Sequence, residues 1–571
     1  MKKIAILTIA LASAVGLFAQ HNEEITIEGS YRPKVNKVDK ILLTPDTPEQ
    51  SFTMPDAKSK VLDIDHRFRL NLDKLSPLAY NNKKGLGDGT ENNFLMAAFG
   101  SRISPCFLYK HNSKLGKDFG LNVGVKHYSS WLDMKKYAPS GFMNNAVEVG
   151  VTDSDFFGFQ LGGKVYYKND LYHYYGVQKA DWAWDQVSLV HGAPRQVYNT
   201  FGTHWDLVST TMRIGDFVHD VGLDYHYMSG EIDNGREHHI ALDYDLGYVD
   251  SWWGKKEYPQ KVGVDVGLQY GYSDLLEQRG YNRLYAKVNP YFEMNGNFYR
   301  LHLGFGVDAA SRFNTWRGIF RIYPDLKGNL FVLNNALEFY AGLNGGRKWI
   351  GYSELVGENP FVSNQLKMEV TTVKLAFEGG VRTNIMNTVD VHVGVRYRNT
   401  ENDYFFSQRI TPSYNGMTQD RPFNSFDVIY DDSRLVTVLG DVRCLIMDNL
   451  TVDAGFAYNK CDPATEEHAW YRPTTQGNLN VNYQLNEELS FDASFLYQGG
   501  RWAKTGATTT SPSVTLKLGD AYDLGLGANY KLREHLSVFM KVDNLLHRKY
   551  QYYLDYPVTG IEAFAGIKMA F

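Results

Sequence analysis

Apolar and polar side chains alternate along the chain from near Asn93 to the C-terminus. In residues 389–397 the odd positions hold valines and a tyrosine, and the even positions include Asp390, His392 and Arg396. A period of two places these two sets on opposite faces of a β-strand. Similar segments recur roughly every 20–25 residues, as expected for long strands joined alternately by short turns and long loops. The pattern predicts an all-β chain.

Two kinds of sheet have this alternation: a sheet between water and a protein core, and a membrane barrel between lipid and its lumen. The length of the array, the aromatic residues at strand ends and an N-terminal export signal favour the membrane. Beyond the N-terminus there is no run of about 18 apolar residues, which excludes ordinary transmembrane helices. We predict a transmembrane antiparallel β-barrel of roughly 18–22 strands over residues 93–571, with apolar faces toward lipid.

The N-terminal residues differ from the rest of the chain. Residues 1–19 contain two lysines, an apolar run and small residues at the end, which is the pattern of a secretory signal peptide. Residues 20–60 are polar, contain several prolines and lack sustained alternation, which predicts an extended periplasmic arm. Residues 61–92 are expected to lead into the barrel without forming a domain.

Composition fits this fold and narrows the chemistry. Aromatic residues make up 14% of the 571 residues and there are 52 glycines, as in a barrel with aromatic girdles, although a large secreted β-protein would be similar. The net charge of −5 argues against a nucleic-acid partner. Three cysteines are too few for a disulfide framework, and one bridge between Cys444 and Cys461 stays open.

No arrangement of residues predicts catalysis, a metal site or a cofactor. His238 and His239 are adjacent, so in a strand they lie on opposite faces and cannot bind one metal ion. Glu237 is expected to pair with His238 at a strand end. No serine lies in a GxSxG motif. We therefore expect a protein that is not an enzyme.

Several connections are too long for turns and carry aromatic residues, and long loops of a barrel are extracellular. They are residues 168–200, 249–259, 347–370, 398–424 and 461–476. Aromatic side chains in the first of them either stack on a sugar or hydrophobic ligand or pack the loops together. The candidates are Tyr172, Tyr174, Tyr175, Trp182 and Trp184.

Charged side chains on the polar faces are expected to line the lumen. They either set the local field and thereby the ion selectivity of a pore, or pair with neighbouring charges and fill the lumen. The candidates are Arg396, Asp453, Lys541, Asp543 and Lys568.

The last strand has one apolar face and ends on an aromatic residue. Ile567, Met569 and Phe571 share that face, and Glu562 and Lys568 lie opposite. This ending resembles the closing strand of outer-membrane β-barrels, in which the terminal aromatic residue is the assembly signal. The resemblance implies that Phe571 is recognised by the barrel assembly machinery.

Three further patches resemble TonB-dependent receptors of Bacteroidetes-type bacteria: residues 542–558, residues 166–176 and the arm sequence SYRPKV at 30–35. The resemblance favours 22 strands and implies a Gram-negative outer-membrane location and transport. The resemblance does not identify a substrate. The segment before the first strand is shorter than the plug domain of that family, so we expect no full plug.

A short β-prone run in the arm resembles the energy-coupling TonB box of that family. Such boxes add a strand to the sheet edge of a periplasmic partner. The alternative is a tail that has no partner. The residues concerned are Glu24, Ile25, Thr26 and Ile27.

These observations predict an outer-membrane transport barrel, porin-like or receptor-like, that passes small solutes through a lumen narrowed by loops and the arm. Expected partners are outer-membrane lipid, the assembly machinery, and TonB or a surface lipoprotein. The alternative is an occluded barrel that acts as a scaffold or assembly partner for other envelope proteins. A transporter requires a continuous polar path, whereas the lumen of a scaffold can be filled by paired side chains.

Overall fold

The computed structural model describes most of residues 92–571. All described residues belong to one compact unit, which begins after residue 63. The expected signal peptide, the arm with its candidate TonB box Glu24–Ile27, and residues 61–91 lie outside the described residues. Within this compact unit the residues that are not described are 64–91, 136, 138, 177–194, 254–257, 313–319, 334–335, 386–387, 410–424 and 507–512.

The described residues form one sheet of 22 antiparallel strands. The strands are β1 (Asn93–Gly100), β2 (Ser104–Lys114), β3 (Phe119–Ser130), β4 (Phe142–Phe156), β5 (Phe159–His173), β6 (Arg195–Ser209), β7 (Phe217–Gly230), β8 (Arg236–Asp250), β9 (Gln260–Leu275), β10 (Gln278–Asn295), β11 (Tyr299–Arg312), β12 (Arg321–Val332), β13 (Leu337–Lys348), β14 (Thr371–Ile385), β15 (Val389–Gln408), β16 (Phe426–Met447), β17 (Leu450–Pro463), β18 (Thr475–Gln484), β19 (Leu489–Gly499), β22 (Ala521–Arg533), β23 (Leu536–Asp543) and β26 (Glu562–Ala570).

Short elements lie in the connections between these strands. Two small hairpins pair β20 (Trp502–Lys504) with β21 (Thr515–Lys517), and β24 (Gln551–Tyr553) with β25 (Tyr556–Pro557). The described helical segments are η2 (Ile232–Asn234) and α4 (Tyr352–Glu358). No helix among the described residues is long and apolar enough to cross a membrane.

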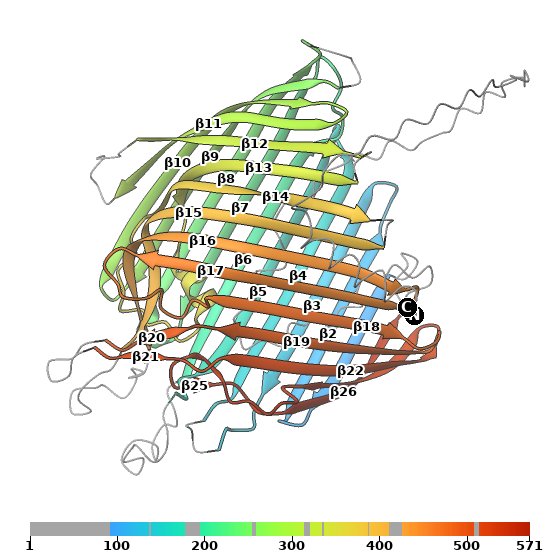
Figure 1. The fold of residues 1–571 in the computed structure, drawn as a ribbon, viewed down its shortest axis with the longest axis vertical. Coiled ribbons are helices and arrows are strands. Elements are labelled where there is room, and N and C mark those ends of the chain that lie inside the picture. The colour runs from blue at the N-terminus through green and yellow to red at the C-terminus, as the bar shows by residue number, and fades with distance from the viewer. Residues whose placement is uncertain are drawn as a thin grey trace, which may run out of the picture. The chain divides into compact units, whose positions relative to one another are not determined.

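The sheet closes on itself into a barrel (Figure 1). Each of the 22 strands pairs with its neighbours in the chain, and β26 pairs with both β23 and β1. Closure leaves no unpaired strand edge, which is the condition for a sheet to exist in lipid. The all-β class, the antiparallel barrel and the favoured strand number are confirmed.

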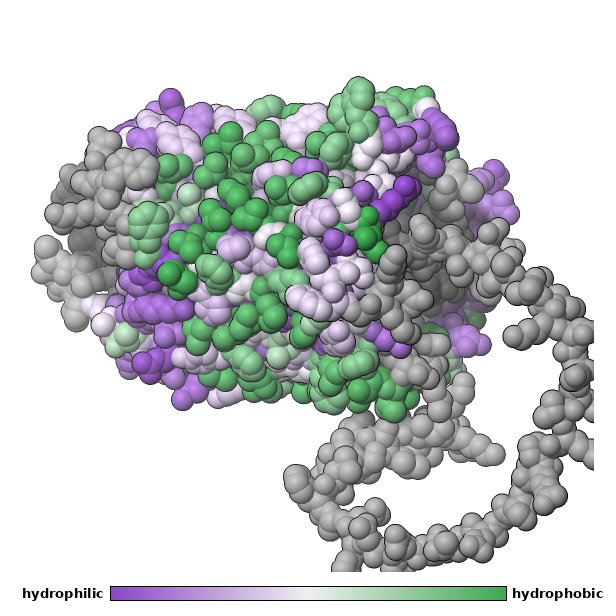
Figure 2. Space-filling view, turned by 90° about the horizontal axis from the view of Figure 1, so that it is seen from above, coloured by the Kyte–Doolittle hydropathy of each residue, from purple (hydrophilic) through white to green (hydrophobic). Residues whose placement is uncertain are grey.

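The alternation separates an apolar exterior from a polar interior. Val393 and Val395 of β15 are exposed, whereas His392, on the opposite face, is hydrogen-bonded to Asp441 of β16, with 3.0 Å between Nδ1 and Oδ2. Figure 2 shows hydrophobic residues over the middle of the outer wall and hydrophilic residues toward its two ends. Exposed apolar side chains on so many strands fit an exterior that is solvated by lipid.

The connections lie alternately at two rims. At the terminal rim β1 begins and β26 ends, and Asn93 exchanges backbone hydrogen bonds with Phe571. At the opposite rim, the loop rim, lie the β5–β6, β13–β14, β15–β16, β17–β18, β19–β22 and β23–β26 connections. These include four of the five long loops expected to be extracellular, 168–200, 347–370, 398–424 and 461–476.

The expectation was wrong for residues 249–259. They connect β8 to β9 and therefore lie at the terminal rim. The rim of a connection follows from its place in the strand order, not from its length. Trp253 packs against Phe292 of β10, with 5.6 Å between the ring centroids. The tryptophans of this connection are thus placed as interface aromatics of a barrel wall.

Candidate functional site

A cluster of buried aromatic rings lies among the loop-rim connections. Eight ring contacts join its members, with centroid distances from 3.8 to 6.0 Å. We call it the aromatic cap. It consists of Tyr174, Tyr175, Phe361, Phe426, Tyr471, Tyr553 and Tyr556.

The aromatic cap joins parts of the rim that are far apart. Tyr175, Phe361 and Tyr556 belong to the third, seventh and eleventh of the loop-rim connections in strand order. Phe361 stacks on Tyr556 at 3.8 Å, and Tyr175 lies 5.0 Å from Tyr556. Connections that begin at widely spaced points around the circular rim of the barrel contact one another only if they reach over its interior. The cap therefore extends across the loop rim.

Hydrogen bonds to backbone carbonyls fix the cap. Tyr198 Oη of β6 donates to the Pro360 carbonyl at 3.2 Å, and Tyr553 Oη donates to the Glu358 carbonyl at 2.8 Å. Tyr175 Oη donates to the Pro557 carbonyl at 3.0 Å. A buried tyrosine hydroxyl and a loop carbonyl both need a partner. These bonds satisfy both groups and tie the β13–β14 and β23–β26 connections to other parts of the rim.

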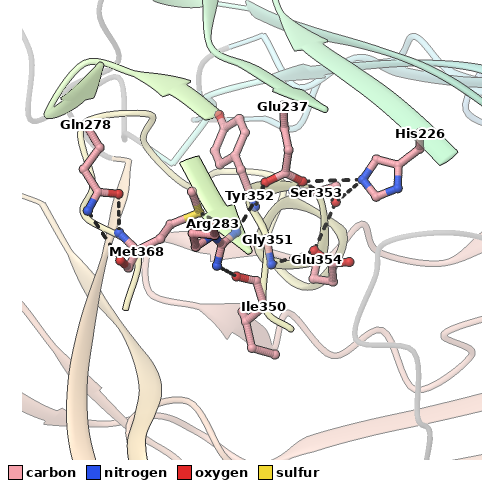
Figure 3. Close-up of polar contacts among 10 residues, drawn as sticks. All are labelled: His226, Glu237, Gln278, Arg283, Ile350, Gly351, Tyr352, Ser353, Glu354 and Met368. Atoms are coloured by element: carbon pink, nitrogen blue, oxygen red, sulfur yellow. Dashed lines mark hydrogen bonds and ion pairs between the residues drawn. The ribbon is translucent and has the colours of Figure 1, made fainter. Parts of the chain in front are cut away.

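The β13–β14 connection is anchored to the barrel wall through α4 (Figure 3). Glu237 of β8 has no exposed surface and accepts hydrogen bonds from Tyr352 N at 2.6 Å and from Ser353 N at 3.2 Å. These amides lie in the first turn of α4, where backbone N–H groups have no partner within the helix. The carboxylate of Glu237 thus caps a helix that belongs to a distant part of the chain.

Arg283 and His226 flank this carboxylate. Arg283 Nη2 of β10 lies 4.0 Å from Glu237 Oε2, and Arg283 Nη1 donates to the Ile350 carbonyl at 2.8 Å. His226 Nε2 of β7 lies 2.9 Å from Ser353 Oγ and 3.4 Å from Glu237 Oε1. Side chains from β7, β8 and β10 therefore hold the N-terminal end of the β13–β14 connection.

Glu354 of α4 lies beside Glu237. It accepts a hydrogen bond from Gly351 N at 2.7 Å. Burial, followed by the negative charge of Glu237, raises the pKa of the Glu354 carboxyl above its ordinary value. The anchor therefore contains one group whose ionisation is opposed by its surroundings.

A small cavity lies beside the aromatic cap. Its volume is about 30 Å³, enough for about one water molecule. Its wall includes Arg472, which forms two hydrogen bonds with Asp403 at 2.7 and 2.9 Å and lies over the Phe405 ring at 4.4 Å. The other lining residues are Glu358, Tyr404, Phe406, Trp470, Tyr471, Gln498, Tyr552 and Tyr553.

The predicted loop aromatics are divided between described and undescribed residues. Tyr172, Tyr174 and Tyr175 are all buried, and their side chains pack with the loop-rim core. This packing is consistent with one of the two interpretations, and ligand binding by these tyrosines stays a prediction. Trp182 and Trp184 lie outside the described residues.

The five predicted lumen charges lie in two places. Arg396 is 3.7 Å from Glu378, and Asp453 is 2.6 Å from Arg443. Four strands on from β17, Lys541 of β23 is 2.9 Å from Asp543, and Lys568 Nζ of β26 lies 4.8 Å from the Phe539 ring centroid. Most of these charges thus have an opposite charge beside them. Their part in selectivity stays a prediction.

One pairing expected from the sequence was wrong, and the cysteine bridge that the sequence left open is not formed. Glu237 pairs with His226 and Arg283 rather than with His238, because Glu237 and His238 are adjacent in β8 and point to opposite faces. The alternation itself contains this signal. Cys444 and Cys461 are free thiols, and they lie opposite Val452 and Leu435 in the β16–β17 pairing.

No metal site was predicted, and among the described residues no three His, Cys, Asp or Glu side chains form a group that could hold a metal ion. The sequence does not predict the Glu237–α4 anchor, since no local pattern links residues 237 and 352. The aromatic cap was missed for the same reason.

No protein-family model matches the chain, and no curated protein matches it. Solved structures do. The ferric-catecholate import receptor Fiu from E. coli, in a closed form, matches with a TM-score of 0.60 and 10% identity over 84% of this chain and 82% of that one. The pyoverdine outer membrane receptor FpvA from Pseudomonas aeruginosa, bound to pyoverdine, matches with a TM-score of 0.61 and 13% identity over 84% and 78%.

The copper transporter OprC matches with a TM-score of 0.57 and 12% identity, covering 84% of this chain and 82% of that chain. Identities this low establish the fold and nothing more. The chain therefore has the barrel fold of outer-membrane receptors and transporters.

Proposed function

We propose that this protein is a transporter of the Gram-negative outer membrane, in which the aromatic cap closes the loop rim in the state described. The aromatic cap is the observation that carries the proposal. A barrel of 22 strands is too wide for its own side chains to fill, so a barrel of this size needs a separate closure. Side chains from the loop-rim connections supply one.

The N-terminal residues have a second role in this proposal. The arm 20–60 and residues 61–92 narrow the lumen from the terminal rim without a full plug, and residues 24–27 engage TonB. Small solutes pass when the β13–β14 and β23–β26 connections separate. Lumen charges such as Lys541 and Asp543 then set which ions pass. The assembly machinery recognises Phe571, and a surface lipoprotein is a candidate partner at the loop rim.

Conductance in a planar lipid bilayer tests the proposal. The mature chain and a variant that lacks residues 20–60 are compared with single-channel recordings. We expect low conductance from the mature chain, and larger steps when the arm is deleted. A large steady conductance in the mature chain would instead identify an open porin without a gate.

A scaffold is the second candidate function. It is favoured by the closed loop rim together with the paired lumen charges, because a filled barrel needs no path. Silence in both recordings, and also in a variant whose aromatic cap is weakened, would replace the transporter with an occluded barrel that binds other envelope proteins.

A further inference from the structure

Arg501, in the β19–β22 connection, is a buried cation without an ion pair among the described residues. Its side chain is 1% exposed. Nη2 donates to the Gly519 carbonyl at 3.0 Å, whereas Nε and Nη1 are buried and have no hydrogen-bond partner in the described part of the chain. Burial of a charged group is costly unless the group is paired and hydrogen-bonded. Two unsatisfied donors on one guanidinium group therefore need an explanation.

Two other arginines of the loop rim, the partly buried Arg472 and the buried Arg283, lie beside acids. Arg472 forms two hydrogen bonds with Asp403, and Arg283 lies 4.0 Å from Glu237. Asp520, which acts on Arg501 electrostatically, instead accepts a hydrogen bond from Tyr497 Oη at 3.2 Å. Arg501 thus differs from Arg283, a second buried arginine of the loop rim, in having no ion pair among the described residues.

An aromatic ring covers the guanidinium group. Cζ of Arg501 lies 5.5 Å from the centroid of the Tyr552 ring. A ring face attracts a cation but accepts no strong hydrogen bond, so it compensates the charge only in part. Tyr552 belongs to β24, in the same connection as the cap residues Tyr553 and Tyr556.

The cavity beside the aromatic cap lies next to this group. Tyr552 and Gln498 line the cavity, and Tyr552 also covers Arg501. Tyr471, which also lines the cavity, donates a backbone hydrogen bond at 2.7 Å to the carbonyl of Trp502, the residue after Arg501. Displacement of the Tyr552 ring would therefore expose the guanidinium group of Arg501 to this cavity.

We propose that Arg501 recognises an oxyanion, a carboxylate or phosphate group of the solute that enters at the loop rim; this rests on the proposed transport function. The anion takes the place of the Tyr552 ring and accepts hydrogen bonds from Nε–H and Nη1–H. Charge-assisted bonds of this kind are stronger than the contact with a ring face. Because Tyr552 moves with Tyr553 and Tyr556, recognition also withdraws the β24–β25 hairpin from the aromatic cap.

Anion titration of the full mature protein in detergent tests this assignment. Inorganic phosphate and acetate are the probes, at neutral pH and constant ionic strength, and intrinsic tryptophan fluorescence reports binding because Trp502 adjoins Arg501. We expect a saturable response from the wild type for at least one probe. Arg501→Gln should weaken it by about tenfold or more, since the donors that engage the anion are lost.

Two further variants define the result. Arg548→Gln removes an equal charge from an exposed position of the β23–β26 connection and should leave the response within about twofold of the wild type. Arg501→Lys keeps the charge and should bind more weakly than the wild type; it also serves if Arg501→Gln does not fold. Equal responses in Arg501→Gln, Arg548→Gln and the wild type, or no saturable response to either probe, would overturn the proposal.

The thermal midpoint without anion separates recognition from a structural role. An unpaired buried charge destabilises the folded state, so Arg501→Gln should unfold at the same temperature as the wild type or at a higher one. A lower midpoint would assign Arg501 to structure and overturn the proposal.

Bilayer recordings keep the two proposals distinct. Anion binding through Arg501 without any conductance contradicts transport only, whereas conductance without Arg501-dependent binding contradicts recognition only.

Discussion

Glu237 is the residue on which the position of the β13–β14 connection depends most directly. Its carboxylate accepts hydrogen bonds from two amides of α4 and from Ser353 Oγ, the last at 2.8 Å. It also faces Arg283 and His226. Removal of one partner from a buried charged group costs more than the pair itself contributes, because the remaining charge is left unpaired.

Glu237→Gln should therefore loosen α4. The substitution leaves Arg283 without its carboxylate partner, and we expect a local cost of about 3–5 kcal/mol. Hydrogen exchange of the α4 amides measures it, as faster exchange of residues 352–358. Asp453→Asn is the matched control, since Asp453 pairs with the largely exposed Arg443 and should cost about 0–1 kcal/mol. Equal effects of the two substitutions would contradict the anchor.

Glu354 gives the same anchor a dependence on pH. Its pKa is raised in the folded protein, so the folded state holds the proton more tightly than the unfolded state does. Above its pKa in the folded protein, Glu354 is ionised and destabilises the fold. This destabilisation disappears as the pH falls from that pKa to the ordinary pKa of glutamate.

Glu354→Gln should consequently slow the exchange of α4 amides at neutral pH, and the gain over the wild type should shrink in mildly acidic solution. Hydrogen exchange at several pH values, corrected for the intrinsic rate, checks this. Glu467→Gln changes an exposed carboxylate of the β17–β18 connection and should alter α4 exchange at no pH. A gain that is constant with pH would show that the charge of Glu354 is not its cause.

At the scale of elements, the strands follow from the sequence and the aromatic cap does not. Alternation is local, so β15 and β17 can be located from their own residues. Phe361 contacts Tyr175 and Tyr556, and each of these lies nearly 200 positions away in the sequence. The periodicity of the sequence contains no information about such distant contacts. Connection length likewise gave no reliable information on the rim, as the β8–β9 connection demonstrates.

Phe361→Ala should weaken the aromatic cap. Phe361 is 1% exposed and contacts four other rings, including Tyr172. Its truncation leaves a cavity and should cost about 3–5 kcal/mol locally. We expect more frequent or larger conductance steps in the bilayer, because the β13–β14 and β23–β26 connections no longer stack. Phe320→Ala, which truncates a 75% exposed ring beside β12, should leave the recordings unchanged.

At the scale of the whole molecule, one strand pair makes a sheet into a barrel. β26 pairs with β1 from Phe94–Ala570 to Gly100–Phe564, and two backbone bonds between Asn93 and Phe571 continue the pair at the terminal rim. Phe571 is half exposed, so its ring adds little packing to the finished barrel. Its deletion therefore separates a role in assembly from a role in stability.

Deletion of Phe571 should lower the amount of folded barrel in the outer membrane severalfold and leave the thermal midpoint of the assembled fraction within a few degrees of the wild type. The backbone bonds at Asn93 are only two of those that close β1 on β26, and each contributes about 1 kcal/mol. Heat-dependent gel mobility measures both quantities.

Phe157→Ala is the control: it removes an 88% exposed ring from the β4–β5 turn at the same rim and should change neither the yield nor the midpoint. A large fall in the midpoint would place the role of Phe571 in the closed barrel, whereas a normal yield would remove it as an assembly signal.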